Sequence, residues 1–117
     1  MRFDIRNCYL RPGFTDLRNG MNGLMRVVMG EMDLDPLGGD LFLFCGRDRH
    51  TIKMLLWSGD GFWLLQKRLH GCTFAWPNSA LEALRIDEDQ VAMLLRGIDF
   101  WRSHPVLLAE KSCWNPL

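Results

Sequence analysis

The sequence has no excess of either charge and no long apolar run. Its 117 residues include 14 basic and 14 acidic side chains, so the formal net charge is zero. A general polyanion-binding domain is usually clearly basic, so this balance argues against one but leaves a local basic patch open. No apolar run approaches the ~18–20 residues that a membrane span needs. The opening residues MRFDIRNCYL lack the apolar segment of a signal peptide. We therefore expect a cytoplasmic protein that does not enter a membrane.

The short motifs of common enzymes are also missing. There is no phosphate-binding loop and no dinucleotide-binding glycine pattern, and no histidine lies near a recognised nucleophile motif. The acidic run Asp87, Glu88 and Asp89 resembles a metal-binding cluster, but helix capping and the helix dipole explain it fully. We expect no enzyme activity, no catalytic residue, no metal and no cofactor.

Cysteine is sparse and widely spaced. Cys8, Cys45, Cys72 and Cys113 form no C-x-x-C pair, so a zinc site or thioredoxin-type chemistry has no local support. In a reducing compartment, cysteines spaced in this way are usually small buried apolar residues rather than disulfides. We expect them to be reduced and buried.

The composition that is present belongs to one globular domain. Hydrophobic residues make up 48% of the chain and charged residues 24%, and the length suits a single core. The patterns predict the α+β class: a small antiparallel, hairpin-rich sheet of about four strands, packed with about three helices. The domain is predicted to span residues 1–101, with a short strand around residues 5–10 and a helix before the antiparallel sheet over 40–77. Residues 102–117 are predicted to form an irregular C-terminal tail.

Helices are predicted before and after the sheet. An apolar stripe at helical spacing follows Thr15, a candidate N-cap, although two internal glycines indicate either close packing or a shorter helix. A C-terminal helix is predicted over 87–97: Asp87 is a good N-cap, Gln90 completes a capping-box-like pair, and Gly97 ends the helix. A short helical turn is predicted over 78–84.

The clearest strand signal is a hairpin over residues 51–69. Segments 51–58 and 62–69 flank Gly59-Asp60-Gly61, where either two-residue loop suits a tight turn. Both loops divide the side chains between the two faces in the same way, because side chains alternate along a strand. One face, which includes Trp63, is almost entirely apolar and is expected to pack on the helices. The other face mixes Trp57 and Phe62 with polar and charged side chains.

This mixed face and the preceding turn supply candidate binding residues. Single-strand nucleic-acid binders combine cations that hold phosphates with rings that stack on bases, and Trp and Arg are also favoured in protein interfaces. A structural alternative is that the rings pack under a helix and the cations are solvated. Lys67 lies on the opposite face from Lys53 and Arg68. The candidate nucleic-acid or partner-binding residues are Arg47, Arg49, His50, Lys53, Trp57, Lys67 and Arg68.

Five segments together resemble the TnpB accessory protein of the insertion-sequence sixty-six family, the product of that element's second small reading frame. It is a different protein from the RNA-guided nuclease of the same name. The segments are TDLRNGMNGL (15–24), DPLGGDLFLFCGR (35–47), IKMLLWSGDGFWLLQKRL (52–69), FAWP (74–77) and AMLLRGID (92–99). The departures are modest: Asn19, Ser58 and His70 stand where the family usually has lysine, aspartate and an acidic residue.

The resemblance implies an accessory role in DNA transposition of an insertion sequence, beside a separate transposase that carries the DNA-cutting chemistry. It supplies no catalytic residue. Two functions stay open: the protein binds the element's terminal DNA, or the same surface docks the transposase as an adaptor without touching DNA. Either way the expected partner is the transposase of the same element, with no membrane partner.

Overall fold

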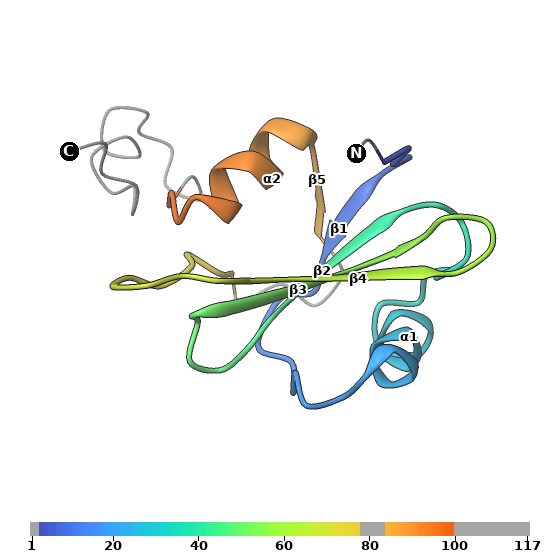
Figure 1. Cartoon of the computed structure of the whole chain (residues 1–117), viewed down its shortest axis with the longest axis horizontal. Coiled ribbons are helices and arrows are strands. Elements are labelled where there is room, and N and C mark those ends of the chain that lie inside the picture. Colours follow the sequence, from blue (N-terminus) through green and yellow to red (C-terminus); the bar gives the residue numbers. More distant parts are fainter. Residues whose placement is uncertain (1–2, 78–83, 100–117) are drawn as a thin grey trace.

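In the computed structural model, which describes residues 3–77 and 84–99, the apolar run LFLFC forms strand β2 (Leu41–Cys45). All five of its side chains are buried, and β2 is the middle strand of a five-stranded sheet. An entirely apolar strand needs cover on both faces of its sheet. Figure 1 shows this cover, with helices α1 and α2 on opposite sides of the sheet.

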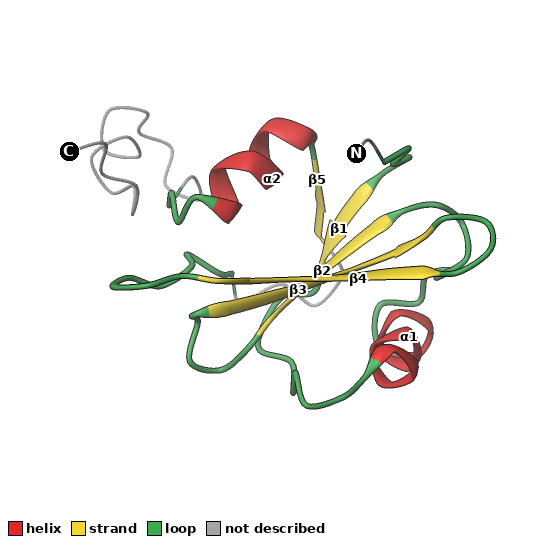
Figure 2. Ribbon diagram, viewed as in Figure 1, coloured by secondary structure: helices red, strands yellow, loops and turns green. Residues whose placement is uncertain are grey.

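The sheet has the strand order β4-β3-β2-β1-β5. β1 pairs with β2 in parallel, because the chain crosses between them through α1, and the other three pairings are antiparallel. The remaining elements are β1 (Cys8–Leu10), α1 (Met21–Gly30), β3 (Thr51–Trp57), β4 (Phe62–Arg68), β5 (Leu84–Ile86) and α2 (Glu88–Leu95). Figure 2 shows the loops gathered around the ends of these strands.

The predicted small sheet packed with helices is therefore correct in outline and wrong in detail. The sheet is mixed rather than antiparallel, because the strand predicted around residues 5–10 joins it as β1, parallel to β2. It has five strands rather than about four, because the three-residue strand β5 is too short to show a period. Two helices are present among the described residues, against about three predicted. Of the predicted turn over 78–84, residues 78–83 lie outside the described part, and Leu84 begins β5. The predicted tail, 102–117, also lies outside it.

The core consists of two apolar clusters, one on each side of the sheet. The α1 side is built mainly from Leu24, Val28, Met32, Phe42, Phe44 and Leu55. The α2 side is built mainly from Leu10, Leu43, Ile52, Leu56, Phe74, Trp76, Val91 and Leu94. Alternate side chains of β2 enter the two clusters, so this one strand joins both halves of the core. In the part of the chain that is described, no helix is long and apolar enough to cross a bilayer.

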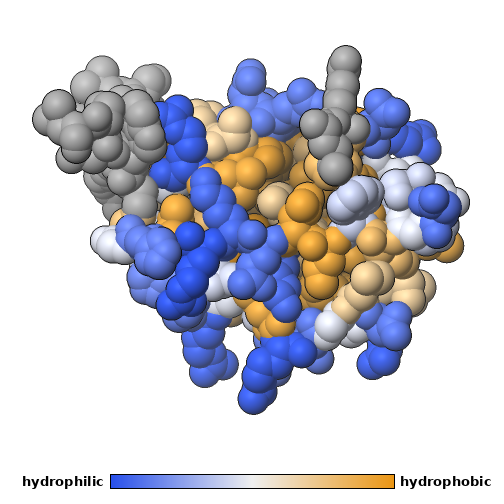
Figure 3. All heavy atoms as spheres, in the orientation of Figure 1, coloured by the Kyte–Doolittle hydropathy of each residue, from blue (hydrophilic) through white to orange (hydrophobic). Residues whose placement is uncertain are grey.

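Some large apolar side chains stay at the surface. Figure 3 shows apolar side chains gathered in the middle of the visible face, with hydrophilic side chains around them. Among the described residues, the exposed large apolar side chains are Phe14, Met21, Met29, Leu37 and Trp63. Trp63 was predicted to pack on the helices, but it is 40% exposed and touches the Phe3 ring edge-on at 5.4 Å. Of the three tryptophans in the described residues, Trp76 is the one that the core buries.

Helix α1 begins at Met21 and not at Thr15 as predicted. The Thr15 N–H donates instead to the carbonyl of Cys45 at 2.8 Å, and its hydroxyl accepts from Arg11 Nη1 at 3.1 Å. Thr15 is therefore buried as an anchor of the loop before α1, whose N-cap is Gly20. Of the two alternatives for this helix, the shorter helix is confirmed.

The predicted capping of α2 is confirmed at both ends. The Asp87 side chain accepts from the Gln90 N–H at 2.7 Å, and the Gln90 side chain accepts from the Asp87 N–H at 2.9 Å. Gly97 follows the helix with φ at 78°, and the Ile98 N–H donates to the carbonyl of Met93 at 3.1 Å. This pattern is a Schellman C-cap.

The predicted hairpin is also confirmed. The Ser58 N–H donates to the Gly61 carbonyl at 2.9 Å, which leaves Gly59-Asp60 as a two-residue turn. Only Gly59 has positive φ in that turn, at 95°, which is the type II′ pattern. The register pairs Trp57 with Phe62, so the division into two faces holds. The mixed face is not open along its length, because α1 covers part of it.

The hairpin turn offers a matched pair of glycines. Gly59→Ala places a Cβ on a residue with φ at 95°, and we expect it to lower the free energy of unfolding by about 1–2 kcal/mol. Gly61→Ala has equally open space and no positive φ, so it should cost nothing or stabilise by up to about 1 kcal/mol. Urea denaturation measures both. Equal losses for the two variants would contradict the type II′ turn.

Candidate nucleic-acid interface

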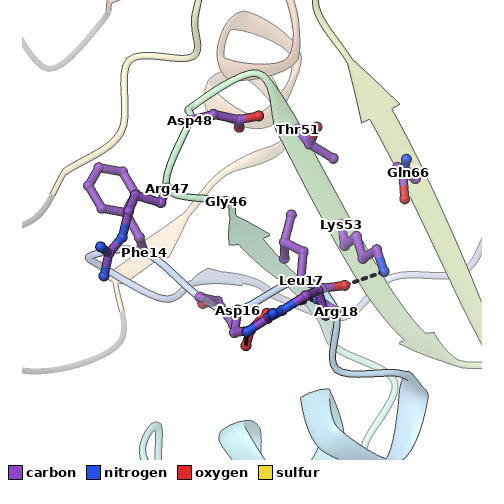
Figure 4. A pocket seen from close by; sticks show the side chains of 11 residues that line it. Phe14, Asp16, Leu17, Arg18, Gly46, Arg47, Asp48, Thr51, Lys53 and Gln66 are labelled. Atoms are coloured by element: carbon purple, nitrogen blue, oxygen red, sulfur yellow. Dashed lines mark hydrogen bonds and ion pairs between the residues drawn. The ribbon is translucent and has the colours of Figure 1, made fainter.

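A polar groove of about 730 Å³ opens on the α1 side of the sheet, at the start of β3. Its walls are the loop before α1 and the turn between β2 and β3, and its floor comes from side chains of β3 and β4 (Figure 4). The lining residues are Phe14, Thr15, Asp16, Leu17, Arg18, Gly46, Arg47, Asp48, Thr51, Lys53 and Gln66.

The loop wall is held against the sheet by cations that bind backbone carbonyls. Arg11 Nη1 donates to the Phe14 carbonyl at 2.7 Å, and Lys53 Nζ donates to the Leu17 carbonyl at 2.7 Å. Figure 4 shows the Lys53 side chain reaching from β3 to this loop. The approach is close enough that a Cβ on Gly46 would lie 3.1 Å from Leu17 Cδ1. Glycine at position 46 therefore allows the loop to pack on the turn.

The turn wall is held by hydrogen bonds within the turn and carries exposed cations. The Gly46 N–H donates to the Thr51 carbonyl at 3.0 Å, and Asp48 Oδ1 accepts from the His50 N–H at 2.9 Å. Arg49 sits in the left-handed region with φ at 62°, which costs a non-glycine residue about 1–2 kcal/mol. The chain thus holds an exposed arginine at a position where glycine would be less strained.

Three of the seven predicted binding residues meet at this groove, and a fourth lies on the turn beside it. Arg47 and Lys53 line it, and Arg49 is exposed on the same turn. Arg68 lies at its rim, where Nη1 donates to Thr51 Oγ1 at 3.3 Å and lies 3.8 Å from a carboxylate oxygen of Asp48. Lys53 is not the solvated charge that one alternative expected, because its ammonium group is half-buried against the loop.

The other three residues lie elsewhere. His50 Nδ1 donates to the Cys72 carbonyl at 2.9 Å, so the imidazole holds the segment after β4 against the β2–β3 turn. Trp57 is half-buried at the far end of β3, four residues or roughly 13 Å by strand rise from the groove residue Lys53, with its ring edge-on to Phe62 at 4.9 Å between centroids. Lys67 is exposed on the α2 side of the sheet, as the alternation predicted.

The sequence prediction missed Phe14, Arg18 and Gln66 as groove residues. Phe14 is 38% exposed and follows the Pro12-Gly13 turn, which is a loop position where an aromatic ring is available for contact. Arg18 was assigned to a helix that in fact starts three residues later. Figure 4 shows Phe14 and Arg47 at one end of the groove, and Lys53 and Gln66 at the other.

The groove carries three cations and two carboxylates, and one carboxylate is already neutralised. Arg18 binds Asp16 through two side-chain hydrogen bonds of 3.0 and 2.9 Å. These bonds, with the Arg18 backbone N–H, lower the pKa of Asp16 to about 2, so it stays ionised in any physiological buffer. Arg47 and Lys53 face only Asp48 as the remaining acidic lining residue, so the groove is locally cationic.

The thiols take no part in this site. Cys8 and Cys45 are free and buried, and burial raises the pKa of both, that of Cys45 to about 12. The expectation of reduced cysteines is wrong at Cys72, which is disulfide-bonded, because sequence spacing cannot show which cysteines the fold brings within bridging distance. Within residues 3–77 and 84–99, no three His, Cys, Asp or Glu side chains are placed to hold a metal ion.

Comparison with known proteins gives the family. The family described as IS66 Orf2 like protein matches residues 6–105, which is most of the chain. The chain belongs to this family. The uncharacterized protein y4hO of Sinorhizobium fredii strain NGR234 is 37% identical over 108 residues, 92% of this chain and 88% of that protein. Protein y4jC of the same strain is 32% identical over 87 residues, 74% of each chain. No solved structure matches significantly.

Membership in the IS66 Orf2-like family confirms the resemblance drawn from the five sequence segments. It implies that the protein takes part in transposition of an insertion sequence. It also supports the expectation of an accessory protein rather than a characterised enzyme.

The Asp16–Arg18 pair in this IS66 Orf2-like chain has a measurable signature. Arg18→Gln removes the strongest cause of the lowered pKa, so we expect the pKa of Asp16 to rise from about 2 toward its ordinary value of ~3.9. NMR titration of the Asp16 carboxyl carbon measures it. Arg26→Gln on the exposed part of α1 is the matched control and should leave this pKa unchanged. An Asp16 pKa that is the same in wild type and Arg18→Gln would contradict the pair.

Proposed function

We propose that this protein assists transposition by binding the terminal DNA of its insertion sequence, together with the separate transposase of the same element. The observation that carries the proposal is the gathering of Arg47, Lys53 and Arg68 at one groove, with Arg49 exposed on the same turn, although the whole chain has no net charge. The acting unit is the domain predicted over residues 1–101. We also expect it in the cytoplasm, in the same compartment as the element's DNA.

The chemistry of the groove suits a phosphate backbone at its rim. Arg47, Arg49 and Arg68 are exposed on one turn and the neighbouring strand end, so they are available to contact phosphates. Gln66 on the floor offers amide donors and acceptors, and Phe14 offers a ring on which an unpaired base can stack. This arrangement supports binding to DNA ends whose strands are partly separated.

A protein-binding role is the second candidate, and a different surface favours it. Met21, Met25 and Met29 follow each other at four-residue spacing along α1. That spacing places them on one helix face, and Met29 is 49% exposed. Exposed methionines adapt to varied partners. This stripe supports the adaptor alternative, in which the protein docks the transposase without contacting DNA.

The double change Arg47→Ala with Arg49→Gly tests the DNA proposal. It removes two exposed cations of the turn, and the glycine relieves rather than strains the backbone at position 49, so folding should be preserved. We expect weaker binding to the element's terminal DNA, and a slope of log K against log salt that is lower by about 2, roughly one for each lost phosphate contact. Fluorescence anisotropy at several salt concentrations measures both. Arg85→Ala, on the edge strand β5 at the other side of the sheet order, is the control and should bind as wild type does.

The adaptor alternative makes the opposite prediction. If it holds, terminal DNA is not retained by the wild-type protein, either alone or with transposase, and Met21→Ser with Met29→Ser weakens transposase pull-down. Trp57→Ala belongs to the same test, because this ring was a candidate contact for a protein partner. DNA affinity that is unchanged by the double arginine variant would overturn the proposal.

A further inference from the structure

The outward-facing backbone of β4 is a second surface. The proposed function uses side chains of this strand, Gln66 and Arg68, but not its free backbone edge. β4 ends the sheet, and among the described residues only β3 pairs with it. It is seven residues long, and its exposed side chains include Trp63, Gln66, Lys67 and Arg68. A long edge strand with an apolar half is a template for pairing with another chain unless something blocks it.

The hydrogen bonds of the hairpin show which backbone groups face outward. The Ser58 N–H bonds to Gly61 and the Leu69 N–H bonds to His50, so the odd-numbered residues of β4 exchange hydrogen bonds with β3. The N–H and C=O groups of the alternate residues therefore point away from the sheet. These residues are Phe62, Leu64, Gln66 and Arg68.

We propose that β4 pairs antiparallel with β4 of a second copy of this chain, about a two-fold axis at Leu65. In this register Leu64 lies opposite Gln66 of the partner subunit, and Phe62 lies opposite Arg68 of the partner subunit. Both pairs join residues whose backbone groups face outward, so all of those groups on the edge find partners. The alternation of inward-facing and outward-facing backbone groups along β4 therefore permits this register.

Side-chain complementarity selects the register. Trp63 lies opposite Lys67 of the partner subunit. The two form a non-hydrogen-bonded pair, in which the Cα atoms are closest. The exposed indole can therefore bind the lysine ammonium group by a cation–π contact. Each aromatic residue of the strand faces a cation, and no two like charges are opposite. If the axis passed through Leu64 instead, Lys67 and Arg68 would lie past the end of the partner's strand and would have no cross-strand neighbour in it. Centring the axis on Gln66 places both cations opposite leucines.

The two-fold axis at Leu65 stands perpendicular to the sheet, so the interface is isologous and the two sheets become continuous. Both α1 helices, and both grooves, then lie on the same side. The pairing does not depend on DNA, so its failure is distinguishable from failure of the proposed function.

Cysteine cross-linking in the full chain tests the register. Leu65→Cys places two thiols directly across the axis, where the short backbone separation suits a disulfide. We expect mild oxidation to give a covalent dimer of this variant, seen by mass spectrometry and on non-reducing gels. The exposed neighbour Gln66→Cys is the matched control: in this register it faces Leu64 of the partner subunit and should cross-link no more than wild type.

Sedimentation equilibrium without DNA tests the energetics. Trp63→Lys puts like charges opposite in two symmetric pairs, so we expect the dimer dissociation constant to rise at least about tenfold. Combining it with Lys67→Glu restores opposite charges and should recover most of the affinity. Wild type that remains monomeric at every concentration, or equal cross-linking of Leu65→Cys and Gln66→Cys, would overturn the proposal.

Discussion

The burial of β2 on both faces is the constraint on which the rest of the structure depends. Burying an aromatic or leucine side chain is worth about 1.5–3 kcal/mol, and β2 contributes two phenylalanines to one cluster and two leucines and a cysteine to the other. Neither cluster forms unless the chain on each side of the sheet folds over it. The first 40 residues therefore supply β1 and α1, and the residues after β4 supply Phe74, Trp76, β5 and α2.

The segments that cover the two faces of the sheet determine which parts of it a ligand can reach. A hairpin alone would offer one complete face of alternating rings and cations, but α1 packs on Leu55 and its neighbours and closes part of it. What stays open is the end of the face near the β2–β3 turn, and the outer edge of β4. Lys53 marks the boundary, because its aliphatic stem lies on the sheet and its ammonium group anchors the loop that walls the groove.

The sequence was most informative where local chemistry is sufficient. The hairpin and the caps of α2 follow from residues within a few positions of each other, such as Gly59 with Asp60, or Asp87 with Gln90. The parallel β1–β2 pair and the three-residue β5 depend on contacts across the fold and leave almost no local pattern. Thr15 misled for the same reason: a residue suited to cap a helix is used instead to bond a distant carbonyl of β2.

The candidate site shows the same division. The cations of the turn were found because they are close in sequence, and Arg68 joins them through the hairpin register. Trp57 was grouped with them because it shares their face, but a strand separates residues on one face by its own length. Phe14 and Arg18 reach the groove only through the fold of the loop before α1.

The most direct test of the central claim is NMR shift mapping of the ¹⁵N-labelled protein during titration with the terminal DNA of its own element. If the groove left open by α1 is the binding surface, the amides that shift will belong to residues 14–18 and 46–51, and the shifts will shrink as salt is added. Shifts confined to the methionine stripe of α1, or no shifts at all, would contradict the account.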